Sequence, residues 1–291
     1  MMQEKEIVFL NGEFLHKDQA KISIFDRGFI FGDGIYEVVP VVFSKMVDRE
    51  EFWQRFERSL GAIKLSLPYK KEEFEDILKD LIAKNSLKEG GIYMQITRGV
   101  ASREFSFVKN LKPTIMAFAF ECSVLKSEFE EGVSVISVPD LRWKRRDIKS
   151  ISLLAQCYAK EQAVEAGAFE AFMIEDGRVN EASSASAFII KDQALITKPF
   201  SNAILPGIRR LNILKFAKEL GLKIEQRAFS MQEVYEADEV FISAATLLLL
   251  SVVKADGKLI NGGKVGKYVP KLRAKYVEKI TKEALAQQDS R

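Results

Sequence analysis

The chain has 291 residues, 47% of them apolar, and a formal charge of +3 that balances 44 basic against 41 acidic side chains. This length suits one large domain or two ordinary ones, and the balanced charge argues against nucleic acid as the main partner, which requires a concentrated basic face. Cys122 and Cys157 have neither disulfide-framework nor metal-ligand spacing, so we expect free thiols in a reducing compartment. The charged start is unlike a signal peptide and no apolar run is long enough for a bilayer, so we expect a cytoplasmic protein without a membrane partner.

A single histidine, His16, limits the chemistry that this chain can perform without a cofactor. A Ser-His-Asp triad, a paired-His zinc helix and a two-His iron site all need histidines that the chain lacks, unless His16 alone serves. We therefore expect no metal site. Acid–base chemistry near neutral pH is left to a carboxylate, a lysine or a bound cofactor.

The first 120 residues alternate between predicted strands and amphipathic helices. Asn11-Gly12 lies between two apolar runs and predicts a hairpin over 6–15 with a type I′ turn. The glycine-rich stretch 26–37 predicts a tight turn or close backbone approach, and its spacing is neither a dinucleotide fingerprint nor a P-loop. Apolar periodicity predicts helices over 49–64 and 71–84, strands over 92–97 and 114–120, and a polar loop over 98–111.

A charged stretch without strand alternation follows residue 120 and predicts a domain boundary. We expect a small N-terminal α+β domain over 1–122, a linker over 123–132 and a larger C-terminal α/β domain over 133–291. In the second domain the sequence predicts strands at 133–139 and 239–243, hairpins at 170–181 and around 256–257, a strand pair flanking 191–192, and helices over 151–167, from Pro206 to Gly221 and from about Pro270.

A basic stretch, residues 141–150, directly follows the strand predicted at 133–139, and five of its ten residues are cationic. Catalytic side chains often lie on loops at such places. A lysine among like charges holds its proton less tightly, and a neutral amine can attack a carbonyl group. Taken alone, the stretch favours a solvated basic loop, and only the sequence around it favours a catalytic lysine.

Four motifs in one order resemble those of the fold-type IV pyridoxal-phosphate enzymes, and most closely those of the D-amino-acid aminotransferases. They are residues 26–39, 142–150, 180–184 and 205–208, and the resemblance extends from about Asn11 to the final helix. It implies a two-domain fold with the cofactor, pyridoxal 5′-phosphate (PLP), in the cleft between the domains. It also implies a homodimer in which the partner subunit helps to close the site.

The resemblance assigns cofactor roles to individual residues. Lys149 would hold the cofactor and shuttle the substrate α-proton, Glu181 would pair with the pyridine nitrogen, and Arg55 would bind the phosphate. The other cofactor positions are Leu205 against the ring, the backbone N–H groups of Ile208 and Arg209, and the late loop at Ala244 and Ala245.

Three departures from the family pattern concern the substrate and the phosphate. Tyr36 and Arg103 would meet the substrate carboxylate, but Phe105 stands where the D-specific enzymes carry a histidine, so one hydrogen-bond donor is missing. Arg209 replaces a threonine, and the pair 244–245 replaces a serine and a threonine. Backbone N–H groups remain at both places, and Arg209 offers a charge instead.

We therefore expect a PLP-dependent transaminase that moves the amino group of a D-amino acid such as D-alanine to a 2-oxo acid such as 2-oxoglutarate. Branched-chain L-amino-acid transamination, (R)-amine transamination and aminodeoxychorismate lyase activity are alternatives of the same fold type. Residues 37–39, Glu-Val-Val, favour the D-specific group over the lyases, which carry threonine after the glutamate. A cofactor-binding homologue with weak or lost catalysis is an alternative of another class, and the pair Lys149 and Glu181 argues against it.

Overall fold

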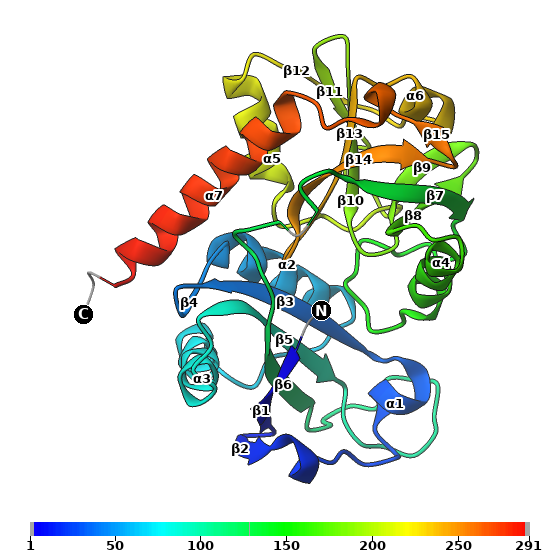
Figure 1. The fold of residues 1–291 in the computed structure, drawn as a ribbon. Coiled ribbons are helices and arrows are strands. Elements are labelled where there is room, and N and C mark those ends of the chain that lie inside the picture. Colours follow the sequence, from blue (N-terminus) through cyan, green and yellow to red (C-terminus); the bar gives the residue numbers. More distant parts are fainter. Residues whose placement is uncertain (1–2, 128, 289–291) are drawn as a thin grey trace. The chain divides into compact units, whose positions relative to one another are not determined.

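The computed structural model describes residues 3–127 and 129–288, which form two compact units (Figure 1). Unit 1 spans Met1–Val124, Ile148–Ser152 and Ile280–Arg291, and unit 2 spans Leu125–Asp147 and Leu153–Lys279. Two segments of the predicted C-terminal domain, 148–152 and 280–291, thus group with unit 1, and the domain ranges drawn from sequence stay a prediction. Within the described ranges, none of the helices has both the length and the apolar character needed to cross a membrane.

Unit 1 is built on a six-stranded antiparallel sheet in the order β2-β1-β6-β5-β3-β4 (Figure 1). Its strands are β1 (Gln3–Leu10), β2 (Glu13–His16), β3 (Gly34–Val42), β4 (Lys45–Met46), β5 (Glu89–Thr97) and β6 (Thr114–Glu121). The predicted first hairpin is confirmed, because Leu10 pairs with Glu13 and leaves a two-residue turn. Asn11 and Gly12 in that turn have φ of 53° and 107°, and a type I′ turn requires positive φ at both positions.

Two amphipathic helices, α2 (Arg49–Ala62) and α3 (Lys71–Lys84), pack against this sheet, and both confirm the predicted helices. Phe52, Phe56 and Phe74 are fully buried in one core with the inward side chains of the strands. Burying one such side chain stabilises the fold by about 1.5–3 kcal/mol, which is why the 3–4 spacing of these residues predicts the helices. Unit 1 also contains the short helices η1 (Lys17–Gln19) and α1 (Arg27–Phe31).

The glycine-rich stretch forms α1, a left-handed turn and the start of β3. Gly32 ends α1 with φ of 66°, and a Cβ atom on Gly34 would lie 2.6 Å from the carbonyl oxygen of Ile96. The predicted tight turn with close backbone approach is therefore confirmed.

Unit 2 contains a nine-stranded mixed sheet in the order β12-β11-β10-β13-β14-β7-β8-β9, with β15 paired to β14 (Figure 1). The pairs β11–β12, β7–β14 and β7–β8 are parallel and the others are antiparallel. The strands are β7 (Val133–Pro139), β8 (Glu170–Glu175), β9 (Arg178–Ala182), β10 (Ser186–Lys191), β11 (Ala194–Thr197), β12 (Lys223–Gln226), β13 (Glu239–Ala244), β14 (Leu248–Ala255) and β15 (Lys258–Leu259). The helices are α4 (Leu154–Glu165), α5 (Arg210–Glu219), α6 (Met231–Tyr235), η2 (Asn261–Gly263) and α7 (Tyr268–Ala286), whose end from residue 280 belongs to unit 1.

Two predicted helix starts are wrong, and β12 and α6 are short elements that the sequence did not predict. Helix α5 begins at Arg210, not at Pro206: residues 205–207 are irregular and residues 208–209 form a turn, in which the Arg210 N–H donates to the Gly207 carbonyl at 3.1 Å. Helix α4 begins at Leu154, because residues 148–152 are instead extended along β3. The mixture of strands and helices in both units confirms the predicted α+β and α/β character.

Candidate active site

Lys149 lies in the short extended segment 148–152, which is held by hydrogen bonds on both sides within unit 1. Its carbonyl oxygen accepts a bond from the Tyr36 N–H at 2.9 Å, and its N–H donates to the Ser59 hydroxyl of α2 at 3.3 Å. Ile148 is buried in the hydrophobic core, and Ser150 forms a bridge with Ile35 of β3. The lysine is therefore positioned by a sheet and a helix although it is not part of a regular element itself.

The Tyr36 ring provides a fixed surface beside the lysine amine. Lys149 Nζ lies 4.0 Å from the centroid of this ring. The ring stacks on Tyr93 at 5.5 Å, and Tyr93 stacks on Phe118 at 4.9 Å, so the three side chains form a row across β3, β5 and β6. Burial, with a smaller effect of Tyr36, raises the pKa of the Tyr93 hydroxyl, which therefore stays neutral.

Arg55 of α2 forms a buried, two-pronged ion pair with Glu37 of β3. Its Nε donates to Glu37 Oε1 and its Nη2 to Oε2, both at 2.7 Å. This fork-to-fork geometry fixes the guanidinium plane. The sequence missed Glu37 as a partner. The phosphate role of Arg55 stays a prediction, and Glu37 accounts for its buried position.

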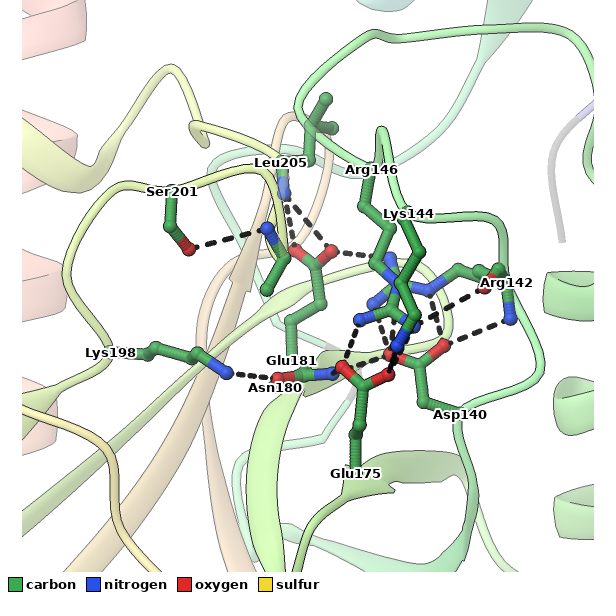
Figure 2. A network of polar contacts seen from close by, with 11 residues as sticks. Asp140, Arg142, Lys144, Arg146, Glu175, Asn180, Glu181, Lys198, Ser201 and Leu205 are labelled. Carbon is green, nitrogen blue, oxygen red and sulfur yellow. Dashed lines mark hydrogen bonds and ion pairs between the residues drawn. The ribbon is translucent and has the colours of Figure 1, made fainter.

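In unit 2, Glu181 lies on β9 and its carboxylate is bound by a cation and by a backbone amide (Figure 2). Arg142 Nη1 donates to Oε1, and the Leu205 N–H donates to Oε1 at 3.0 Å and to Oε2 at 3.2 Å. Burial raises the pKa of the Glu181 carboxyl, while the charge and hydrogen bond of Arg142 act in the opposite direction. The structure thus brings together two predicted residues, Glu181 and Leu205, and adds Arg142.

The basic stretch carries its own set of carboxylate partners (Figure 2). Asp140 and Glu181 pair with Arg142, Glu175 pairs with Lys144 and Arg146, and Asp147 pairs with Arg145. The pKa of Glu175 lies well below its usual range, because Arg146 and Lys144 donate hydrogen bonds to it. The expected excess of positive charge in this stretch is therefore largely neutralised, and Arg142 and Arg146 belong to a buried network and not to a solvated loop.

Two serines after Glu181 hold the turn that follows β9. Ser183 and Ser184 donate their hydroxyls to the fully buried carboxylate of Glu170, the second at 2.6 Å. Ser183 also donates its backbone N–H to the carbonyl of Ala171 at 3.0 Å. Two of the small residues that were predicted to allow close approach, Ser183 and Ser184, thus form hydrogen bonds to the first residues of β8.

The predicted phosphate residues of unit 2 meet at the start of α5. Arg209 is the residue before the first helical turn, its guanidinium donates to the carbonyl of Ala245, and it lies 5.0 Å from the Tyr276 ring. Ala244 ends β13 and Ala245 begins the turn into β14. Ile208 precedes Arg209 in the turn before the helix. The first amides of a helix and its positive dipole end favour an anion.

Ser243 is a hydroxyl that the sequence did not single out. It directly precedes Ala244, is buried, and its Oγ has no hydrogen-bond partner among the residues that the structure describes. A buried hydroxyl without a partner costs free energy. Ser243 is therefore a candidate donor one position before the expected serine and threonine.

Arg103 and Phe105 lie in the irregular loop between β5 and β6, as predicted. The Arg103 guanidinium lies 5.7 Å from the Phe31 ring and 5.4 Å from the Phe105 ring, and the two rings are 5.6 Å apart. Phe105 is 78% exposed. Across 3–127 and 129–288, no recorded contact joins this group to Tyr36, so the structure does not bring the three predicted substrate residues together.

Comparison with known proteins gives one consistent result. The family model described as amino-transferase class IV matches residues 34–255. The chain is 40% identical over 275 residues to a D-alanine aminotransferase of Staphylococcus haemolyticus, covering 93% of this chain and 98% of the relative. Among solved structures it resembles the branched-chain amino acid aminotransferase of Escherichia coli, with a TM-score of 0.87, 23% identity and 95% of both chains covered. It also resembles a T.th. branched-chain amino acid aminotransferase complexed with N-(5′-phosphopyridoxyl)-L-glutamate, with a TM-score of 0.86, 24% identity and coverage of 95% and 94%.

Proposed function

The chain belongs to the amino-transferase class IV family and is an aminotransferase, and we propose that it transfers the amino group of D-amino acids, D-alanine among them, to 2-oxo acids. The substrate class is supported by the 40% identity to a D-alanine aminotransferase over nearly the whole of both chains. The likeness to branched-chain aminotransferases, at 23–24% identity, supports the fold alone.

We propose PLP as the cofactor, and the residues of each unit fit its chemical groups. Glu181 is a buried carboxylate suited to a protonated ring nitrogen, and it is the observation that carries the assignment. The start of α5 and the buried hydroxyl of Ser243 suit a phosphate, and Lys149 offers an amine on a rigid backbone. When bound, PLP supplies an electron sink for the substrate carbanion.

The chain's own residues then handle the protons. We assign to Lys149 the removal and return of the substrate α-proton, since its amine lies against the Tyr36 ring and its backbone is held at both ends. Glu181 would hold the protonated ring nitrogen of the cofactor, and its Oε2 is the less occupied oxygen, since among the described contacts it accepts only the longer Leu205 bond. Arg55 and Arg209 remain proposed phosphate-binding residues. Arg209 is held at the turn after β13 by its hydrogen bond to the Ala245 carbonyl.

We assign the substrate carboxylate to Tyr36 and Arg103. The Arg103 guanidinium lies next to two aromatic rings and is exposed to solvent. An exposed guanidinium suits the recognition of a carboxylate. Phe105 adds an apolar surface where the D-specific relatives implied by the motifs have a second donor.

A homodimer is also proposed, and exposed apolar side chains of unit 1 support it. Phe29 of α1 is 72% exposed, and Phe25 and Phe105 are exposed as well. These residues share one surface, because Asp26 bridges to Val100 and the Phe31 and Phe105 rings are in contact. Such clusters mark interaction sites. In sedimentation velocity, Phe29→Glu should shift a dimer toward monomer, and a wild type that is monomeric at micromolar concentration would contradict the proposal.

The substrate class is tested by single half-reactions of the cofactor-loaded protein. D-alanine, D-glutamate, L-leucine, L-glutamate and an (R)-amine are mixed with it in turn, and loss of the cofactor's visible absorption is followed by stopped flow. We expect the fastest conversion with a D-amino acid and none in Lys149→Ala. Faster conversion by L-leucine or by the (R)-amine would reject the D-specific assignment and favour another fold-type IV activity.

A further inference from the structure

Asp140 is a fully buried carboxylate that directly follows β7, and four donors converge on it (Figure 2). Arg142 donates from its backbone N–H at 3.1 Å, from Nε at 2.9 Å and from Nη2 at 2.8 Å. Asn180 donates from Nδ2 at 2.7 Å. Burial acts to raise the pKa of the Asp140 carboxyl, but Arg142 and Asn180 outweigh it, so the pKa lies below its ordinary value. Asp140 is therefore an anion in the folded chain.

Arg142 stands between two carboxylates and divides its donors unequally. Three of its N–H groups go to Asp140, and only Nη1 goes to Glu181. The side-on pair with Asp140 fixes the plane of the guanidinium, because two parallel bonds leave it no free rotation. The same pair offsets the positive charge of the guanidinium that also contacts Glu181.

The charge balance at Glu181 follows from this arrangement. If Arg142 paired with Glu181 alone, its positive charge would offset the charge of the carboxylate and weaken the binding of any other cation to it. With Asp140 present, Asp140, Arg142 and Glu181 together carry one net negative charge, and Arg146, whose Nε lies 3.5 Å from Asp140 Oδ2, is paired by two hydrogen bonds with Glu175. That surplus charge is what a protonated ring nitrogen requires.

We propose that Asp140 is a positioning residue that, by engaging Arg142 side-on, offsets the positive charge of the guanidinium and so helps the Glu181 carboxylate to keep a proton on the cofactor's ring nitrogen. The inference rests on the proposed function. It concerns the charge and orientation of Arg142. Other charged groups of the network, Arg146, Glu175 and Lys198, lie one step further from Glu181.

The test measures the protonation of the ring nitrogen directly. Wild type and Asp140→Asn are reconstituted with ¹⁵N-labelled PLP, and the ¹⁵N chemical shift is followed against pH. We expect Asp140→Asn to lower the midpoint of protonation by about one pH unit, a tenfold loss of proton affinity, and to slow the D-alanine half-reaction, with cofactor affinity within about threefold of wild type.

Glu175→Gln is the matched control, because it removes a carboxylate of the same network that contacts Arg146, Lys144 and Asn180 but not Arg142. It should lower stability without moving the ¹⁵N midpoint. Asp140→Glu keeps the charge and should keep most of the protonation. If Asp140→Asn does not fold, Asp140→Ser removes the same charge and takes its place, with the same expected shift.

Two failures are distinguishable. If wild type binds no PLP, the proposed function is wrong. If wild type binds PLP with a protonated nitrogen and Asp140→Asn, or its serine replacement, has the same midpoint, or if Glu175→Gln moves it equally, Asp140 is only a structural anchor and the inference is overturned.

Discussion

The network around Glu181 and the loop that carries Arg103 are both assigned to ligand binding, yet they are held in opposite ways. In the first, Asp140, Arg142 and Glu181 are 0%, 5% and 7% exposed and each side chain has charged partners. In the second, Arg103 is exposed and its recorded contacts are with aromatic rings. A buried ionic network tolerates no loss of a partner, whereas an exposed loop tolerates substitution at small cost. We expect changes in the network to cost stability and chemistry, and changes in the loop to alter specificity.

The largest expected effect is at Lys149. Hydrogen bonds fix its backbone on both sides, and its side chain is half-buried. Lys149→Ala should lower turnover by about 10³-fold or more, because the base for proton transfer is lost. Lys144→Ala removes an exposed lysine from the same basic stretch and should retain turnover. Borohydride reduction followed by peptide mapping should place the cofactor on Lys149. A label on another lysine contradicts the assignment.

Breaking the network itself should have the next largest effect. Arg142→Ala leaves Glu181 and Asp140 buried without their cation and should lower the free energy of unfolding by about 3–5 kcal/mol. Arg145→Ala is the matched control, since Arg145 also pairs with an aspartate two residues away but is exposed, and its loss should change the free energy of unfolding little or not at all. Urea unfolding of both variants measures the difference. Equal losses would mean that burial does not distinguish the two pairs.

Strong acid should weaken the network. The folded-state pKa of Asp140 lies below the ordinary 3.8, so this carboxylate stabilises the fold above that pH and the stabilisation is lost as pH falls through the folded-state value. Asp140→Asn lacks this dependence. The gap in unfolding free energy between wild type and Asp140→Asn should therefore be constant near neutral pH and narrow below a pH of 3.8. A gap that widens on acidification would contradict the assignment of Asp140 as an anion.

In the loop, Arg103→Ala should leave stability nearly unchanged and act on substrate binding. Loss of one charged contact to the carboxylate should raise KM for D-alanine by about 10- to 100-fold, with a smaller change in kcat. Lys109→Ala, an exposed cation of the same loop, is the control and should change neither constant. If both variants behave like wild type, Arg103 is a solvated arginine and the substrate carboxylate is bound elsewhere.

The smallest expected effect is at Phe105. Phe105→His restores a second donor and should improve kcat/KM for D-alanine by about three- to tenfold, while weakening the contact with the Phe31 ring. Phe107→His changes a ring of the same loop that lies 3.7 Å from Arg98 and should bring no gain. An unchanged kcat/KM in Phe105→His would show that the loop does not face the substrate carboxylate.

The sequence by itself determined the features that depend on neighbouring residues. The spacing of Phe52, Phe56 and Phe74 predicted α2 and α3, and Asn11-Gly12 predicted the first turn, because periodicity and turn chemistry are local properties. Four ordered motifs were enough to indicate the family that the comparisons establish.

Only the tertiary structure decided which charges meet. Arg142 and Glu181 are 39 residues apart and Arg55 and Glu37 are 18 apart, so no local pattern pairs them. Two acidic partners of the basic stretch, Glu175 and Glu181, are far from it in the sequence, on β8 and β9, and only the pairing of these strands beside β7 brings them to it. Burial makes each of these pairings obligatory, because an ion without a partner in the interior costs more than the fold can supply.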